Sequence, residues 1–272
     1  MRHRILGAAL LGLLAAAGPA ARLAAQEAPG DRWSWHGTLA AGRTLEIRDI
    51  SGSVTADAAP GGEIEVTAVK HAGRHGNPAD VQIREEDGPD GVRICVIYPG
   101  RSMEDGCRGR GSRRHDDDDD DNRNDTSVDF TVHVPRGIAF SGNTVNGDVY
   151  ARGLDSRVAA RSVNGAVEIQ TSAGDAEGES VNGSVRARLL GQGTEPLRFS
   201  SVNGTVEVTL PRGSDADLDA STVNGSINSD FDITIQGGMT MRRQRLHGRI
   251  GHGGRTLRLN TVNGSIWLRA AS

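Results

Sequence analysis

Short stretches of alternating apolar and polar residues dominate the chain from about residue 127 onward. Val163 is followed by Val167 and Ile169, and the same alternation follows Val202 and Val262. A second alternating stretch precedes these valines, with an apolar residue five positions upstream in most copies: Phe140, Val158, Leu197, Leu218 and Leu257. A period of two residues predicts strands, so each unit holds two short strands, and the inward phase slips once between them. No long run of apolar residues with helical spacing follows residue 25, which excludes a helical bundle.

One short phrase, Ser/Thr-Val-Asn-Gly, recurs six times in this region. Its Asn-Gly pairs are Asn146-Gly147, Asn164-Gly165, Asn182-Gly183, Asn203-Gly204, Asn224-Gly225 and Asn263-Gly264. The asparagines lie 18, 18, 21, 21 and 39 residues apart, and the doubled last gap predicts a hidden copy at Leu246–Ile250, with His247 in place of Asn. Weaker copies stand at Trp35–Leu39 and Ile50–Val54. A fixed period near 20 residues is typical of a solenoid or another repeat array.

Two all-β architectures fit a unit of two strands with one phase slip. In the favoured one, the chain turns a corner just before the valine and winds as a β-solenoid of two-strand repeats, each about 18–21 residues long. The valine and its +4 and +6 neighbours then point inward, the asparagines stack from repeat to repeat, and the glycine permits positive φ at the corner. In the alternative, Asn-Gly is a type I′ turn, the chain forms an antiparallel hairpin array, and the Ser or Thr of the phrase points inward.

These repeats resemble a family of bacterial β-strand-repeat proteins called "putative adhesin", a domain family of unknown function. The resemblance rests on the serial Ser/Thr-Val-Asn-Gly-x-Val/Ile phrases, on strands ended by Pro-x-Gly at Pro135 and Pro211, and on the closing segment Thr261–Arg269. It covers about residues 33–271 apart from a charged insert, and is firmest over 127–271. It implies a β-repeat fold and brings no catalytic residues with it.

Composition favours several small aliphatic cores over one conventional core. Hydrophobic residues make up 36% of the 272 residues and aromatic residues only 3%, although aromatic side chains supply the largest burial per residue. The formal net charge is −4 and no segment of the mature chain is purely basic, which argues against a nucleic-acid partner. We predict four segments: a signal peptide at 1–25, an N-terminal β segment with degenerate repeats at 26–98, a charged low-complexity insert at 99–126, and the β-repeat solenoid at 127–272.

The first 25 residues have the three parts of a secretory signal peptide: charged Arg2–Arg4, apolar Ile5–Ala17 and the small-residue site Leu23–Ala25. The apolar run is shorter than the roughly 20 residues that cross a bilayer, and no later stretch is long enough. We therefore expect an exported mature chain without a membrane span, in the periplasm, at the cell surface or secreted. In an oxidising compartment, Cys95 and Cys107 are expected to form a disulfide that tethers the insert.

Candidate metal-binding groups are poorly organised. The run Asp116–Asp121 lacks the central glycine and the final glutamate of an EF-hand. The histidine pairs His71/His75 and His247/His252 have no third ligand in view. We expect no cofactor and no bound metal.

We therefore predict an exported, non-catalytic protein for adhesion, envelope scaffolding or surface interaction, with a glycan, an envelope component or a surface protein as its partner. The alternative is a carbohydrate-active enzyme on a β-helix scaffold. Its candidate acids are Asp148, Glu168 and Glu207, which lie near equivalent repeat positions. Retaining hydrolysis would need two carboxylates about 5–5.5 Å apart.

Overall fold

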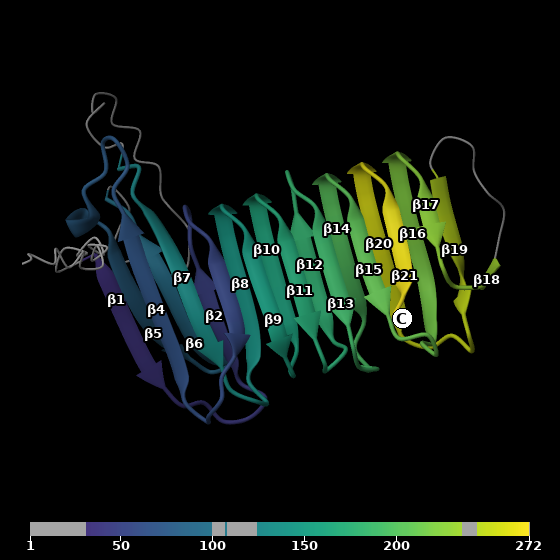
Figure 1. The fold of residues 1–272 in the computed structure, drawn as a ribbon, viewed down its shortest axis with the longest axis horizontal. Coiled ribbons are helices and arrows are strands. Elements are labelled where there is room, and N and C mark those ends of the chain that lie inside the picture. The colour runs from purple at the N-terminus through teal and green to yellow at the C-terminus, as the bar shows by residue number, and fades with distance from the viewer. Residues whose placement is uncertain (1–30, 100–106, 108–123, 236–243, 272) are drawn as a thin grey trace, which may run out of the picture.

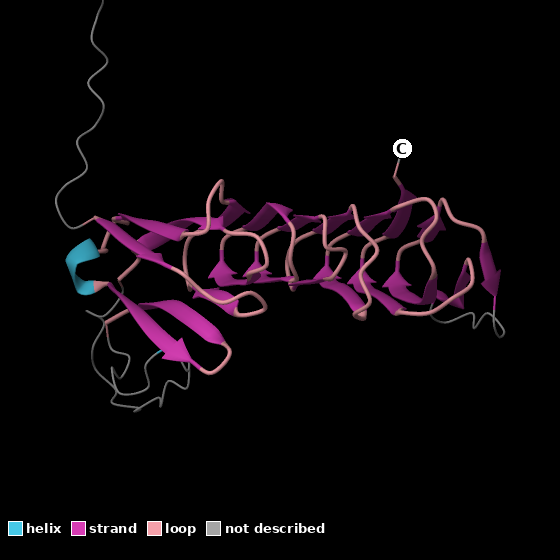
Figure 2. Cartoon of the chain, turned by 90° about the horizontal axis from the view of Figure 1, so that it is seen from below, coloured by secondary structure: helices cyan, strands magenta, loops and turns pink. Residues whose placement is uncertain are grey.

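The computed structural model describes residues 31–99, 107, 124–235 and 244–271. The predicted signal peptide and the run Asp116–Asp121 lie outside these residues. The described chain is all-β apart from one short 3-10 helix, η1 (Pro78–Asp80). Its strands form one sheet of ten strands and one of eleven, stacked as two layers of an elongated molecule (Figures 1 and 2).

The two sheets draw their strands from all along the described chain. The ten-stranded sheet has the order β1-β4-β7-β3-β9-β11-β13-β15-β21-β17. Its strands are β1 (Arg32–Gly37), β3 (Val54–Ala58), β4 (Ile64–His71), β7 (Ser127–Val134), β9 (Val149–Leu154), β11 (Val167–Thr171), β13 (Val185–Leu189), β15 (Val206–Leu210), β17 (Ile227–Ser229) and β21 (Ile266–Ala270). The eleven-stranded sheet has the order β18-β19-β16-β20-β14-β12-β10-β8-β2-β6-β5. Its strands are β2 (Thr44–Arg48), β5 (Gln82–Gly88), β6 (Gly91–Ile97), β8 (Ala139–Asn146), β10 (Val158–Asn164), β12 (Ala176–Ser180), β14 (Leu197–Asn203), β16 (Ala216–Asn224), β18 (Ile233–Ile235), β19 (Gln244–Ile250) and β20 (Thr256–Asn263).

From β8 to β15 the chain alternates between the two sheets, and we call each strand of the eleven-stranded sheet together with the strand that follows it a rung. Neighbouring rungs pair in parallel: Val158 of β10 lies beside Phe140 of β8 and Ala176 of β12. A two-residue hairpin joins antiparallel strands only, so the hairpin alternative is wrong for this region. β2 and β3 add a further rung, in parallel with β8 and β9.

The space between the two sheets is filled mainly by Val, Ile, Leu and Ala. The apolar residues predicted to point inward upstream of the phrase are at most 1% exposed: Phe140, Val158, Leu197, Leu218 and Leu257. The alternating residues downstream, such as Val167 and Ile169, are buried as well. The core therefore runs as one continuous aliphatic layer along the stack, not as the several small cores predicted from composition, and Phe130, Phe140 and Phe199 are among its largest fully buried side chains.

One rung lies out of chain order. β20 lies between β14 and β16, and β21 lies between β15 and β17, as the yellow strands between green ones show in Figure 1. The chain leaves a gap of one rung between β15 and β16, extends the eleven-stranded sheet with β18 and β19, and then returns to fill the gap. The predicted hidden copy at Leu246–Ile250 is wrong, because β19 runs antiparallel along β16 and the doubled spacing reflects this excursion.

The N-terminal end of the stack is built differently. β4 pairs antiparallel with both β1 and β7, and the β5–β6 hairpin extends the eleven-stranded sheet beyond β2. The weak copy at Ile50–Val54 takes a corner position, because Ser51 bridges Asn146 in parallel. The weak copy at Trp35–Leu39 does not, because β1 ends at Gly37 and pairs antiparallel with β4.

Candidate functional site

At each repeat corner, the Ser or Thr of the phrase points into the space between the sheets. These side chains belong to residues that are 1–5% exposed: Thr144, Ser162, Ser180, Ser201, Thr222 and Thr261. Each hydroxyl donates to the carbonyl oxygen of the corner glycine in the neighbouring rung, as Ser180 does to Gly165 over 2.8 Å. A buried hydroxyl and a corner carbonyl thus satisfy each other.

The valine of the phrase is exposed, so the prediction that it points inward is wrong. The six valines are 37–42% exposed: Val145, Val163, Val181, Val202, Val223 and Val262. Successive side chains of a strand point to opposite faces, so burying the preceding hydroxyl turns the valine outward.

The asparagines form a ladder on the surface of the stack. Five of the six side chains, all but that of Asn146, donate Nδ2 to the Oδ1 of an asparagine in a neighbouring rung over 2.7–2.8 Å. The order along the stack is Asn146, Asn164, Asn182, Asn203, Asn263 and Asn224. Asn263 thus separates Asn203 from Asn224, which are neighbours in the sequence of repeats.

The corner glycines allow neighbouring rungs to pack closely. The prediction that they adopt positive φ is wrong. Of the six, only Gly147 has a positive φ, and its value of 159° is close to extended backbone. A Cβ atom on Gly183 would overlap the carbonyl oxygen of Gly165, and the other five meet the same obstacle in their own neighbouring rungs. The corner therefore excludes a side chain because a carbonyl group occupies the space.

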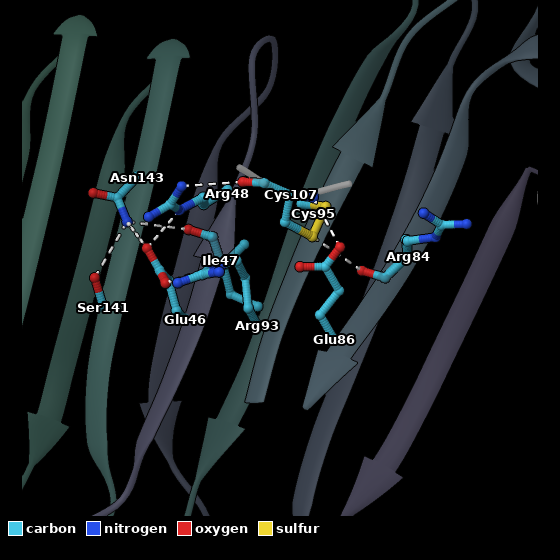
Figure 3. Close-up of polar contacts among 10 residues, drawn as sticks. All are labelled: Glu46, Ile47, Arg48, Arg84, Glu86, Arg93, Cys95, Cys107, Ser141 and Asn143. Carbon is cyan, nitrogen blue, oxygen red and sulfur yellow. Dashed lines mark hydrogen bonds and ion pairs between the residues drawn. A yellow bond between two sulfur atoms is a disulfide. The ribbon is translucent and has the colours of Figure 1, made fainter. Parts of the chain in front are cut away.

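A polar cluster joins β2, β6 and β8 beside the disulfide (Figure 3). Glu46 Oε1 lies 2.6 Å from Arg48 Nε, and Glu46 Oε2 lies 2.7 Å from Arg93 Nε. Asn143 Nδ2 donates to Glu46 Oε1 over 3.4 Å, and Arg48 Nη1 donates to the carbonyl oxygen of Cys107 over 3.1 Å. The sequence offers no signal for this cluster, since most of its partners lie 47 to 97 residues apart.

Cys95 on β6 and Cys107 form the predicted disulfide, with Cα atoms 5.6 Å apart. Both cysteines are nearly fully buried. The backbone N–H of Cys107 donates to Glu86 Oε1 over 2.9 Å. These contacts fix residue 107 of the predicted insert against the β5–β6 hairpin (Figure 3).

A cleft of about 350 Å³ lies next to this cluster, between β2, β8 and the β5–β6 hairpin. We call it the hairpin cleft. It is lined by Thr44, Glu46, Glu86, Asp87, Gly88, Pro89, Asp90, Gly91, Val92, Arg93 and Ser141. Carboxylates, hydroxyl groups and one guanidinium therefore face the same space, and most of them belong to short side chains or to side chains held by the ion pairs above.

A buried acid, Asp49, follows β2 and is 6% exposed. Its Oδ1 accepts the N–H of Ile50 over 2.7 Å, whereas its Oδ2 has no hydrogen-bond partner among the described residues. Burial raises the pKa of Asp49 to about 7. Burial and the nearby Asp49 carboxylate also raise the pKa of Tyr98, whose hydroxyl donates to the carbonyl oxygen of Thr126 over 2.9 Å. The alternation that buries Leu45 and Ile47 places Asp49 inward as well, so a signal for this buried acid is present in the sequence.

The three candidate acids of the enzymatic alternative do not form one cluster. Asp148 and Glu168 both lie near Tyr150, whose hydroxyl donates to Asp148 Oδ2 over 2.7 Å and whose register partner is Glu168, whereas Glu207 lies apart from them. Glu168 on β11 and Glu207 on β15 lie two strands apart, with Arg186 of β13 in the row between them. Asp148 lies at the corner before β9, where its Oδ1 accepts the N–H of Ala166 over 2.7 Å.

The histidine pairs do not converge on a common site either. His71 Nε2 lies 3.1 Å from Asp129 Oδ2, and the His75 backbone N–H donates to Asp125. The side chain of His252 is 97% exposed. Within the described ranges, no group of three or more His, Cys, Asp or Glu side chains could hold a metal ion. No helix in the described part of the chain has the length and apolarity needed to cross a membrane.

Two facing sheets with corner ladders define the chain as an all-β repeat protein. The family model Toastrack DUF4097 matches residues 121–269, and the chain belongs to that family. This agrees with the family resemblance of the repeats.

Two solved structures are similar to this chain. A putative cell adhesion protein from Clostridium sporogenes ATCC 15579 is 11% identical, with a TM-score of 0.45, over 88% of this chain and 100% of the other. A putative adhesin from Bacteroides fragilis NCTC 9343 is 10% identical, with a TM-score of 0.29, over 88% and 97%. No curated protein matches the chain.

Proposed function

We propose that the chain is an exported, non-catalytic β-solenoid that binds a glycan of the cell envelope or cell surface through the hairpin cleft. The observation that carries the proposal is that the polar residues of the repeats bind one another or the backbone within the stack. The Ser/Thr hydroxyls bind corner carbonyls and the asparagines bind one another, so the repeats hold the stack together. Because these polar repeat groups are occupied within the stack, polar recognition falls to exposed side chains that do not repeat.

Export is supported by two features. The first 25 residues have the composition of a secretory signal peptide. The Cys95–Cys107 disulfide is typical of an oxidising compartment.

The chemistry of the hairpin cleft supports a hydroxyl-rich ligand. Its volume of about 350 Å³ lies at the lower end of the range for small-molecule sites, which suits a short glycan segment. Carboxylates accept hydrogen bonds from sugar hydroxyls, and an arginine donates to sugar oxygens. Asp87 and Asp90 are exposed at the rim of the cleft, and the ion pairs of Glu46 hold Arg93 in place.

Binding of the purified exported chain to an array of envelope and host polysaccharides, followed by calorimetric titration of each hit, tests the proposal. We expect Asp87→Asn and Asp90→Asn to weaken binding by roughly tenfold each, because each removes a charge-assisted hydrogen bond. Glu168→Gln, which changes a partly exposed acid on the ten-stranded sheet, is the control and should leave the affinity unchanged.

Three outcomes would overturn parts of the proposal. Equal weakening by the control and the cleft variants would remove the cleft as the site. Silence on every glycan together with capture of a surface protein would replace the ligand class. The appearance of shortened glycan after incubation would replace the non-catalytic assignment with the enzymatic one.

A further inference from the structure

The rung β20–β21 occupies a slot whose walls come earlier in the chain. In the eleven-stranded sheet, Leu257 lies beside Leu197 on one side and Leu218 on the other. In the ten-stranded sheet, Ile266 lies beside Val206 and Ile227. We call the space between the rungs β14–β15 and β16–β17 the rung slot. Without its occupant, one edge each of β14, β15 and β16 would lose its partner, and β17, which pairs only with β21, would have no strand partner. Unpaired edges readily accept another strand.

The contacts inside the rung slot are made by the residues that recur in every rung. The rung buries Leu257, Leu259, Ile266 and Leu268, each at most 2% exposed. Its corner hydroxyl, on Thr261, donates to the carbonyl oxygen of Gly204 over 2.8 Å. Its ladder residue, Asn263, is hydrogen-bonded to Asn203 on one side and to Asn224 on the other. The same segment of a second copy would make the same contacts, so exchange between copies costs no interaction within the slot.

A glycine-rich turn connects β19, on the outer side of β16, to β20 on its inner side. Gly251, Gly253 and Gly254 have φ values of 57°, 79° and 136°, which favour glycine. Such a turn tolerates large changes of backbone angle, because glycine has no Cβ atom.

One side chain anchors the start of the inserted rung. Arg255 has a side chain that is only 7% exposed, and its Nη1 donates to the carbonyl oxygen of Gly174 over 2.7 Å. The same Nη1 lies 3.6 Å from Asp175 Oδ1. Arg255 thus ties the entry of β20 to the loop between β11 and β12.

We propose that β20–β21 exchanges between two copies of this chain. In the exchanged dimer, the glycine turn of each copy extends and its rung fills the slot of the other. Arg255 limits the rate at which the rung leaves its own slot. This inference does not depend on the glycan ligand proposed above.

Mixed single-cysteine variants test the exchange directly. Ser200 lies on β14, which forms one wall of the rung slot, and its register partner is Asn260 on β20, which occupies the slot. We would mix Ser200→Cys chains with Asn260→Cys chains and oxidise them. A disulfide between the two chains forms efficiently only when the rung of one copy lies in the slot of the other. Ser141→Cys mixed with Ala159→Cys is the matched control, because these register partners belong to rungs that follow each other in the chain.

We expect the interchain disulfide to exceed the control severalfold, to increase with protein concentration, and to increase further when both chains carry Arg255→Ala. A second measurement uses two differently tagged copies of the unmodified chain, which should co-purify after incubation together. The double variant Ser200→Cys/Asn260→Cys, oxidised within one chain, locks the rung and should abolish co-purification. Interchain disulfide at the control level without co-purification would overturn the proposal, and so would co-purification that persists when the rung is locked.

Discussion

Removing one asparagine from the ladder should cost stability in proportion to the number of ladder bonds it makes. Asn182 donates to Asn164 and accepts from Asn203, both over 2.8 Å, so Asn182→Ala removes two bonds. Asn146 stands at the end of the ladder and only accepts from Asn164. A side-chain hydrogen bond contributes about 0.5–1.5 kcal/mol net, and exposure places these bonds in the lower half of that range. We therefore expect a loss of about 1–2 kcal/mol for Asn182→Ala and about half of that for Asn146→Ala.

The out-of-order rung makes the ladder a test of topology as well as of energy. Asn203 and Asn263 are hydrogen-bonded although 60 residues separate them, so their double-mutant cycle should give a coupling energy of about 0.5–1 kcal/mol. Asn203 and Asn224 belong to successive copies of the phrase in the sequence, but in the stack Asn263 lies between them. Their coupling energy should be close to zero.

Urea unfolding followed by far-UV circular dichroism would measure these free energies, provided that the slope of the transition is the same in all variants. Equal losses at Asn182 and Asn146 would refute the count of ladder bonds. A coupling between Asn203 and Asn224 that matched the coupling between Asn203 and Asn263 would refute the inserted rung.

Three further perturbations test the corner, the buried acid and the disulfide. Gly183→Ala should lower the free energy of unfolding by about 2–4 kcal/mol, because its Cβ would overlap the backbone of Gly165 in the preceding rung. Gly213→Ala, with open space around it, should change it little in the same urea assay. Asp49 has a folded-state pKa of about 7 against an ordinary value of 3.8, so its stabilising contribution is complete below about pH 4 and is lost as the pH rises through 7. Thermal unfolding across this range should show a decline on the order of 4 kcal/mol that Asp49→Asn removes, and an unchanged profile in the variant would contradict the assignment. Replacing Cys95 and Cys107 together by serine should lower the free energy of unfolding by about 2–3 kcal/mol, and a chain equally stable with and without reductant would show that the disulfide contributes nothing.

The local pattern was sufficient to locate the strands of the repeats and most of their core-facing residues. Alternation with a period of two requires one face to be apolar wherever a sheet covers a core, so Val158, Val167 and Ile169 could be placed inward from the sequence alone. The same rule would have placed Asp49 inward, next to Leu45 and Ile47. The identity of the repeated asparagines predicted a stack, because equivalent side chains of parallel rungs lie about 4.8 Å apart.

The orientation of the corner was decided by hydrogen bonding across rungs. Hydrophobicity favours the valine of the phrase over the preceding Ser or Thr as the buried residue. The stack buries the Ser180 hydroxyl instead, because the carbonyl oxygen of Gly165 in the neighbouring rung needs a donor there, and Val181 is left 39% exposed. The corner glycine is required for a related reason, since the space above it is filled by the neighbouring rung.

The order of the rungs was decided only by the tertiary structure. Every copy of the phrase offers the same strands, the same hydroxyl and the same amide, so the sequence of one rung does not specify its neighbour. The segment β20–β21 lies between β14–β15 and β16–β17 because the chain leaves a gap of one rung there and returns to it after β18 and β19. The Glu46 cluster and the hairpin cleft likewise depend on segments far apart in the sequence. Local periodicity determined what a rung is, and long-range pairing determined where each rung lies, because the recurring phrase is the same in every rung and does not specify their order.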